Sequence, residues 1–304
     1  MFLLFIAVIF TLGFVAPVQT AINSEAARYI HSPIGASLYS FLSGTAALLL
    51  IVIAVEHGLS FSPETLQGLP WWAWLGGAAG VFGITANILL LPRLGSIHTV
   101  IMPLVGQVTA GFIIDAFGLF DTAVMPLSVS RIVGFAIIIL GVFFSVVSRS
   151  ADTHPVKALG WQLLGIVAGA ALAMQPAINS RLAVAVGSPL QASLFSFASG
   201  TILLLAIMYI AKDHRPYVAG VITAPRPGWT WLGGLIGVCV VVGQTYLVRY
   251  VGVGLLTILN IFGMLVSGAL IDHFGLLNTV KRPVSGRKLL GLALVLAGII
   301  ILNI

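Results

Sequence analysis

The chain has 304 residues, of which 59% are hydrophobic and only 7% are charged. A soluble globular domain carries about 25% charged residues, so this chain has too few charges to cover a surface that faces water. Its apolar content excludes a disordered protein. The 14 Lys and Arg residues give a net charge of +6 but form no basic stripe, so we expect a lipid bilayer, and no nucleic acid, as a partner.

Apolar segments follow one another along the whole chain. A transmembrane helix needs about 20 mostly apolar residues. Ten segments meet this requirement: residues 2–23, 34–55, 71–91, 97–118, 129–148, 160–178, 190–211, 229–248, 254–275 and 287–303. The breaks between them contain polar residues or clusters of Pro and Gly. We therefore predict an all-α polytopic membrane protein with ten transmembrane helices.

The first five predicted helices recur in the second half of the chain. Four motifs are repeated in the same order: residues 19–24 and 175–180, 32–45 and 188–201, 74–80 and 231–237, and 114–118 and 271–275. Counterparts lie 156 residues apart in the first two motifs and 157 apart in the last two. The chain is therefore predicted to contain two copies of a five-helix unit, the first at residues 1–150 and the second at residues 151–304.

An odd number of helices in each copy has a geometric consequence. The second copy enters the membrane from the opposite side, so the two copies are predicted to be inverted repeats. Secondary transporters are commonly built in this way, with the substrate site near the midplane between the repeats.

The orientation follows from the basic residues that flank the predicted spans. Eleven of the 14 Lys and Arg residues lie on the side that carries the linker at residues 149–160. The other side carries Arg131, Arg181 and Arg249. Since Lys and Arg are enriched on the cytoplasmic side, we predict that the linker is inside and that both termini are outside.

Glycines spaced four residues apart occur in the third and eighth helices. Gly76 and Gly80 form one such pair, and Gly233 and Gly237 form the other. Small residues at this spacing let helices approach closely in lipid, so we interpret both pairs as helix–helix interfaces. The same spans begin with tryptophans, which we interpret as anchors at the level of the lipid headgroups: Trp71, Trp72, Trp74, Trp229 and Trp231.

Two pairs of amide side chains lie within predicted spans. Gln19 and Asn23 are four residues apart and share a helix face, and Gln175 and Asn179 repeat this spacing. In inverted copies the two pairs can face each other, and four amides would suit a neutral or zwitterionic polar ligand. Two other interpretations stay open: the amides join helices by hydrogen bonds, or the asparagines end their helices.

Three further amides are candidates for the substrate path. Asn87 and Gln244 occupy equivalent positions in the third and eighth helices. Gln107 lies within the fourth helix, but its counterpart in the second copy is Met264. A ligand site can lack symmetry in this way, whereas a symmetric structural pair would keep both amides.

Two acidic residues are present in both copies, each at the end of a fourth helix. Arg131 follows Asp115 by 16 residues, and Lys288 follows Asp272 by 16 residues. We therefore predict structural ion pairs between the fourth and fifth helices of each copy. Gating or proton transfer by these carboxylates is the alternative.

The sequence lacks the signatures of several other classes. No phosphate-binding loop occurs, the six histidines have no spacing suited to a metal, and no acidic residue falls in the middle of a span. We expect no enzyme activity, no cofactor and no metal.

The four repeated motifs resemble those of the YdcZ-type branch of the drug/metabolite transporter (DMT) superfamily, in which five-helix units occur singly or fused in tandem. The resemblance covers nearly the whole chain and implies a transport protein of the bacterial inner membrane. It carries family positions over to these residues: Gln19, Asn23, Gln107, Asp115, Gln175, Asn179 and Asp272. Met264 departs from the pattern, because a glutamine is usual there.

Together these features predict a secondary transporter that moves small polar metabolites or drug-like organic compounds by alternating access. The alternative is a membrane scaffold or accessory subunit that transports nothing. Because both copies are fused, a single chain is expected to form a complete pathway, and a homodimer is not required.

Overall fold

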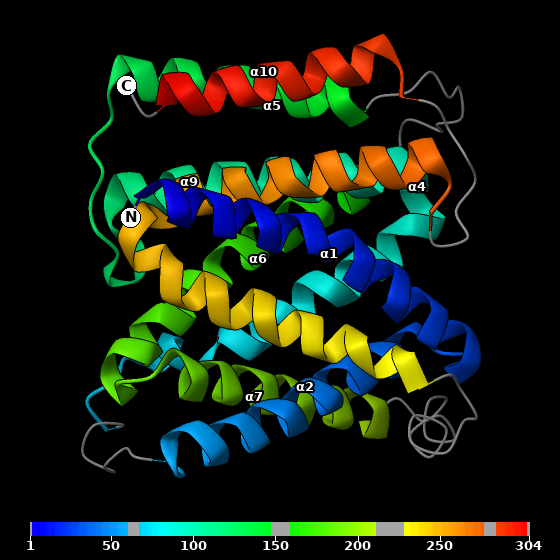
Figure 1. Cartoon of the computed structure of the whole chain (residues 1–304), viewed down its shortest axis with the longest axis vertical. Helices are drawn as coiled ribbons and strands as arrows, with labels where there is room; N and C mark the ends of the chain where they lie inside the picture. The colour runs from blue at the N-terminus through cyan, green and yellow to red at the C-terminus, as the bar shows by residue number, and fades with distance from the viewer. Residues whose placement is uncertain (1, 60–66, 147–158, 211–227, 277–283, 303–304) are drawn as a thin grey trace.

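The computed structural model describes residues 2–59, 67–146, 159–210, 228–276 and 284–302, and every regular element within these ranges is helical (Figure 1). The long helices are α1 (Phe2–Ile30), α2 (Pro33–Glu56), α4 (Gly76–Phe117), α5 (Val129–Val146), α6 (Leu159–Val186), α7 (Pro189–Ile210), α9 (Leu232–Phe274) and α10 (Gly286–Leu302). Three short 3-10 helices flank α4 and α9: η1 (Trp71–Trp74), η2 (Leu119–Asp121) and η4 (Gly228–Trp231).

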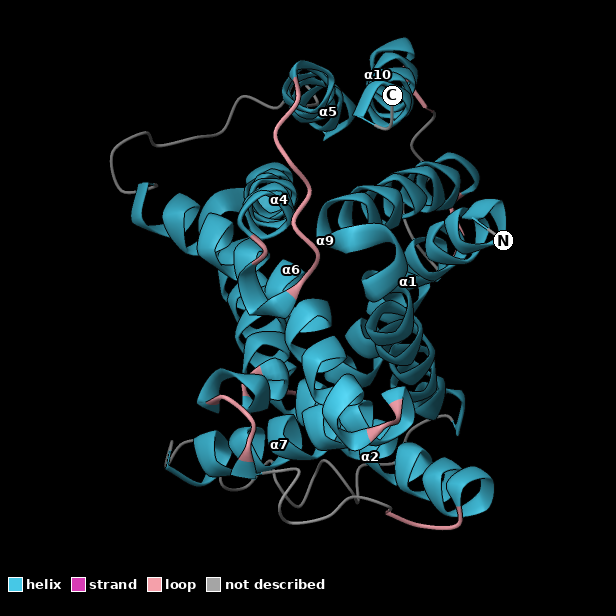
Figure 2. Cartoon of the chain, turned by 90° about the vertical axis from the view of Figure 1, so that its left-hand side faces the viewer, coloured by secondary structure: helices cyan, strands magenta, loops and turns pink. Residues whose placement is uncertain are grey.

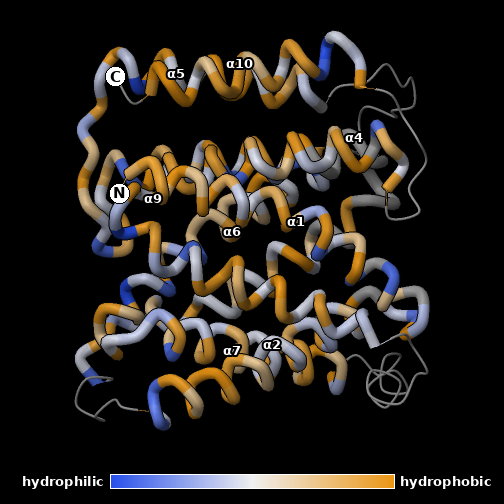
Figure 3. Tube along the Cα trace, viewed as in Figure 1, coloured by the Kyte–Doolittle hydropathy of each residue, from blue (hydrophilic) through white to orange (hydrophobic). Residues whose placement is uncertain are grey.

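The helices have the length and composition of membrane spans. Within the described ranges, five stretches are long and apolar enough to cross a bilayer: Phe2–Ala27, Ile34–Glu56, Leu159–Val186, Pro189–Ile210 and Gly228–Ile271. Shorter apolar helices cover Gly76–Ala86, Ile101–Phe117 and Val129–Ser145. In Figure 3, hydrophobic residues run along the helices and the most hydrophilic residues gather mainly near helix ends. The fold is thus that of an all-helical membrane protein.

The repeated Ser-Pro dipeptide starts a helix in each half of the chain. Ser32 Oγ accepts a hydrogen bond of 3.0 Å from the N–H of Gly35 at the start of α2. Ser188 Oγ accepts one of 3.1 Å from the N–H of Gln191 at the start of α7. Each serine satisfies a backbone donor that has no partner within its helix. The proline that follows it has no N–H to satisfy.

Helix α9 consists of two arms that join at Gly252. This residue has φ 79° and ψ 167°, which are not helical angles. Gln244 Nε2 donates a hydrogen bond of 3.1 Å to Asn260 Oδ1, although 16 residues of straight helix would separate the two by about 24 Å. The arms, residues 232–251 and 253–274, therefore fold back on each other. Figure 1 shows the yellow arm running to the left and the orange arm returning to the right.

Helix α4 also folds back, although its residues are helical without a gap from Gly76 to Phe117. A Cβ atom on Gly165 of α6 would lie 3.3 Å from Leu90 Cδ1 and 2.7 Å from Met102 Cβ. Twelve residues of straight helix would span about 18 Å, so the backbone must turn between Leu90 and Met102. The predicted spans 71–91 and 97–118 therefore lie on the two sides of this turn.

Four helix pairs make the most extensive contacts: α4 with α6, α1 with α9, α5 with α10, and α2 with α7. Figure 2, which views most of these helices nearly end-on, shows the α5–α10 pair at one end of the molecule and the α2–α7 pair at the other. Each pair joins a helix of residues 1–150 to a helix of residues 151–304. The two halves of the chain therefore interleave.

At the α2–α7 contact, residues meet their own repeat counterparts. The Oγ1 atoms of Thr45 and Thr201 are hydrogen-bonded at 3.0 Å. The rings of Phe41 and Phe197 lie with their centroids 5.3 Å apart. Both pairs are 156 residues apart in sequence. A residue can contact its own counterpart only close to an axis that relates the two copies.

Glycines form the contact between α5 and α10. A Cβ atom on Gly134 would lie 2.9 Å from the carbonyl oxygen of Gly298, and one on Gly291 would lie 2.7 Å from the carbonyl oxygen of Gly141. The two contacts are equivalent under the 157-residue offset. The backbones approach this closely because neither residue of a pair carries a side chain.

Candidate functional site

The amides of α6 lie against glycines of α4. A Cβ atom on Gly76 would overlap Asn179 Oδ1, and one on Gly80 would lie 2.7 Å from Gln175 Nε2. Any residue larger than glycine at either position would displace an amide. The spacing of four residues on both helices lets the two amides and the two glycines meet in register.

The same arrangement occurs between α1 and the first arm of α9. A Cβ atom on Gly233 would overlap Asn23 Oδ1, and one on Gly237 would lie 2.6 Å from Gln19 Nε2. The glycine pairs and the amide pairs, which the sequence analysis interpreted separately, are thus the two faces of one kind of interface. Each amide pair thus contacts a glycine pair from the other repeat. The sequence alone did not identify this partner.

Asn179 is buried without a hydrogen-bond partner. Its exposed fraction is 1%, and neither its Oδ1 nor its Nδ2 is paired within the described part of the chain. Ser196 Oγ, on the neighbouring helix α7, is also buried and unpaired. A buried polar group without a partner costs roughly 1–3 kcal/mol. Asn179 therefore does not join helices by hydrogen bonds in this structure.

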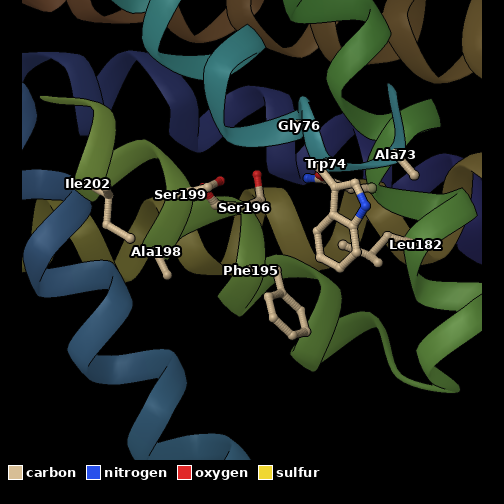
Figure 4. A pocket seen from close by; sticks show the side chains of 10 residues that line it. Ala73, Trp74, Gly76, Leu182, Phe195, Ser196, Ala198, Ser199 and Ile202 are labelled. Carbon is tan, nitrogen blue, oxygen red and sulfur yellow. The ribbon is translucent and has the colours of Figure 1, made fainter. Parts of the chain in front are cut away.

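A cavity of about 320 Å³ adjoins this amide (Figure 4). Its lining consists of Ala73, Trp74, Gly76, Asn179, Leu182, Phe195, Ser196, Ala198, Ser199 and Ile202. The volume lies at the lower end of the range for small-molecule sites. The lining contains no charged residue; its polar side-chain groups are the hydroxyls of Ser196 and Ser199, the amide of Asn179 and the indole N–H of Trp74.

Two aromatic rings form part of the cavity wall. The centroids of Trp74 and Phe195 lie 5.7 Å apart, with the rings nearly perpendicular at 87°. In Figure 4 the Trp74 ring lies to the right of Ser196, and the Phe195 ring lies below both. The sequence suggests Trp74 as a headgroup anchor and offers no motif that points to Phe195. The repeated motif at residues 188–201 was the signal that could have identified Ser196 and Ser199.

Two of the other candidate amides, Gln244 and Gln107, lie outside this cavity. Gln244 is hydrogen-bonded to Asn260. The Nδ2 of Asn260 donates a hydrogen bond of 3.8 Å to the sulfur of Met264. Gln107 is buried, with 9% exposed, and does not line the cavity. The side chain of Asn87 lies outside the described residues. Asn260 is a polar residue that the sequence analysis missed, because its counterpart in the first copy is a proline.

Asp115 is fully buried and binds the start of the second arm of α9. Its Oδ1 accepts a hydrogen bond of 2.7 Å from the N–H of Val253, and its Oδ2 accepts one of 2.8 Å from the N–H of Gly254. Arg131, the partner that the sequence predicts, lies 3.7 Å from Oδ2. The backbone contacts were not expected. They place the carboxylate at a helix N-terminus, where the helix dipole favours a negative charge.

The equivalent acid in the second copy is Asp272, whose side chain lies outside the described residues. Its pairing with Lys288 therefore stays a prediction. A different ion pair joins Arg181 Nε to Asp121 Oδ2 at 2.7 Å, linking the end of α6 to η2.

Comparison with solved structures identifies a similar fold. A structure entitled "Crystal structure of protein" aligns with a TM-score of 0.67 and 16% sequence identity, over 99% of this chain and 96% of the other. This similarity extends to the fold alone. No curated protein matches the sequence.

Comparison with protein families assigns the sequence to one of them. The family described as "Putative inner membrane exporter, YdcZ" matches residues 4–144 and again residues 160–301. The two matches cover nearly the whole chain and describe a transporter rather than an enzyme. The chain therefore belongs to the YdcZ family of the DMT superfamily, a family of inner membrane exporters.

Proposed function

We propose that this protein is a secondary transporter of small, uncharged organic molecules that carry both an apolar body and a hydrogen-bonding group. The observation that carries the proposal is the unpaired, buried amide of Asn179 beside a cavity with aromatic and aliphatic walls. Such molecules fall within the wider class of small polar metabolites and drug-like compounds that the sequence predicts.

The chemistry of the cavity favours a neutral ligand. An amide offers two donors and an acceptor, so a ligand amide or hydroxyl could satisfy both unpaired atoms of Asn179. A carboxylate or an ammonium group would lose its hydration without meeting an opposite charge, at a cost of several kcal/mol. The edges and faces of Trp74 and Phe195 suit a flat apolar body.

Transport in this proposal uses ten spans arranged as two inverted five-helix repeats, residues 1–150 and 151–304, that alternate access to the site. The fold-back of α4 and of α9 supports ten crossings, since each of these helices is too long to cross once. The reciprocal contacts at Thr45 and Thr201 support a two-fold relation. The start of α1 and the end of α10 lie on the same side in Figure 1, in keeping with an even number of spans; the distribution of basic residues favours the outside for that side.

A binding experiment with a matched pair of probes tests the proposal. Nicotinamide is a flat ring with a neutral amide, and nicotinate replaces that amide with a carboxylate. We expect nicotinamide to quench or shift the tryptophan fluorescence of the purified protein in detergent, since Trp74 lines the cavity, and nicotinate to have a much weaker effect. Uptake of radiolabelled nicotinamide into proteoliposomes then measures transport directly.

The variant Asn179→Leu separates a ligand site from a structural amide. Leucine has the same branching pattern as asparagine and removes two unpaired polar atoms, so we expect the melting temperature to stay constant or rise while nicotinamide binding is lost. Asn260→Leu is the control: its amide is paired with Gln244 and lies outside the cavity, so binding should persist while stability falls by about 1–3 kcal/mol. If no probe binds and Asn179→Leu melts far below wild type, the scaffold function replaces this proposal.

A further inference from the structure

The amide and hydroxyl residues of the cavity are Asn179, Ser196 and Ser199, and we call them its polar floor. The repeat provides an equivalent set of residues in the other half of the molecule. The counterparts of Asn179, Ser196 and Ser199 are Asn23, Ser40 and Ser43. Asn23 Oδ1 is buried and unpaired, as is Asn179 Oδ1. Figure 1 shows the end of α1, which carries Asn23, on the right, and the end of α6, which carries Asn179, on the left. The two floors therefore lie toward opposite ends of the helices.

The serine contacts are also repeated. A Cβ atom on Gly77 of α4 would overlap Ser199 Oγ, and one on Gly234 of α9 would overlap Ser43 Oγ. Both serines donate to a carbonyl oxygen in the preceding turn at 3.1 Å, Ser199 to Ser196 and Ser43 to Ser40. The polar floors of the two copies thus have the same residues in the same contacts.

The walls of the two copies differ. At the site that contains Asn23, the ring of Tyr39 packs on Trp231 with centroids 4.5 Å apart. The Tyr39 hydroxyl is hydrogen-bonded to Thr230 Oγ1 at 3.3 Å. Tyr39 and Thr230 are each 1% exposed, and Ser43 is 4% exposed. The contact with Thr230 therefore fixes the Tyr39 side chain in a buried position.

At the site that contains Asn179, both hydroxyl groups of this contact are missing. Phe195 stands in the place of Tyr39, and Ala73 stands in the place of Thr230. The Phe195 ring lies 5.7 Å from Trp74, and both Phe195 and Ser199 are only half-buried. The cavity is found on this side. The hydrogen bond between two side chains is thus present where the wall is closed and absent where the wall is open.

We infer that Asn23, Ser40 and Ser43 form a second copy of the site, that the Tyr39–Thr230 contact closes it in this structure, and that opening of one copy closes the other. The inference rests on the proposed function, because in alternating access one side of the molecule opens as the other closes. It adds that the hydroxyl pair biases the protein toward the state with the Asn179 cavity open. A net hydrogen bond of this kind changes an equilibrium by roughly threefold to tenfold.

Cysteine accessibility tests the inference without any ligand. Cys239 is the only cysteine of the chain, so a Cys239→Ala background allows single reporters at Ser43→Cys and Ser199→Cys. Because Ser199 is half-buried and Ser43 is 4% exposed, we expect N-ethylmaleimide to label the Ser199→Cys reporter faster than the Ser43→Cys reporter. Tyr39→Phe and, separately, Thr230→Ala should each raise the rate at Ser43→Cys and lower the rate at Ser199→Cys, by roughly threefold to tenfold.

The reverse change provides a stricter test. The double variant Ala73→Thr with Phe195→Tyr installs the hydroxyl pair at the Asn179 site, and we expect it to lower labelling at Ser199→Cys and raise it at Ser43→Cys. Tyr209→Phe removes a hydroxyl from a side chain that is 68% exposed and should leave both rates unchanged.

One-sided changes would overturn the inference. If Tyr39→Phe raises labelling at Ser43→Cys alone, the contact only packs the wall locally, and if it changes neither rate, the contact does not control access. These rates are measured in the absence of ligand, so a failure of nicotinamide to bind would count against the proposed substrate class and would leave the labelling result unaffected.

Discussion

At the scale of single residues, the structure separates two kinds of buried polar group. Asp115 has every strong partner that a carboxylate needs: two backbone N–H groups and a nearby guanidinium. Asn179 has none in the described part of the chain. A fully satisfied group serves the fold, whereas an unsatisfied group lowers stability and calls for a functional explanation. Among the residues that the sequence selected, Asn179 is therefore the stronger ligand candidate.

The contacts of Asp115 predict a difference between two variants. Asp115→Asn removes the charge that the N–H groups of Val253 and Gly254 bind, and should destabilise the protein by about 3 kcal/mol. Arg131→Met removes a partner at 3.7 Å and should cost less, since the backbone donors remain. Melting temperatures of the two purified variants, measured side by side, check this order. Equal losses would mean that the ion pair, and not the backbone contact, holds the carboxylate.

At the scale of helices, the long elements α4 and α9 are each folded back rather than straight. In α9 this depends on Gly252, whose φ of 79° and ψ of 167° fall in a region that is essentially restricted to glycine. The N–H groups freed at the break are those of Val253 and Gly254, which Asp115 binds. Break and cap are thus one structural unit that joins the two repeats.

Gly252→Ala should therefore lower stability by about 1–3 kcal/mol through backbone strain. The added Cβ would also lie 2.7 Å from Met125 Cε and 2.9 Å from Asp115 Oδ2. Gly268→Ala is a control in the same helix, where no atom lies within 4 Å of the new Cβ, and it should be neutral or slightly stabilising. Thermal unfolding of both variants checks the prediction; similar melting curves for the two would show that the turn needs no glycine.

At the scale of the whole molecule, the contacts sort into two groups under exchange of the two repeats. The contacts of Thr45 with Thr201 and of Phe41 with Phe197 map onto themselves. The contact of Tyr39 with Thr230 maps onto Phe195 and Ala73, which have no hydroxyl groups. If the protein works by exchanging the conformations of its repeats, the first group stays intact in both states and the second group changes.

Covalent links at the two kinds of contact should then differ in effect. In a Cys239→Ala background, a disulfide or short cross-link between Thr45→Cys and Thr201→Cys should leave uptake into proteoliposomes nearly unchanged. A link between Tyr39→Cys and Thr230→Cys should abolish it until a reductant is added. Loss of uptake with the first link would show that α2 and α7 move apart during transport.

The sequence by itself determined the membrane character, the helical class and the duplication of this protein. Composition alone excludes a water-facing surface, and repeated motifs locate equivalent residues such as Asn23 and Asn179 without any coordinates. The break at Gly252 also lies between two spans that hydropathy had separated. These properties depend on the local chain or on its comparison with itself, so they can be read along one dimension.

Only the tertiary structure decided which groups meet. Glycine spacing indicated that Gly76 and Gly80 lie on a helix surface that another helix can approach closely, but not that α6 would present its amides there. Trp74, which the sequence suggests as a membrane anchor, also lines the cavity, and Asp115 binds the backbone of residues 253 and 254, about 140 positions away. The reason is physical: contacts between helices in lipid depend on where separate segments cross in space, and the local sequence does not contain that information.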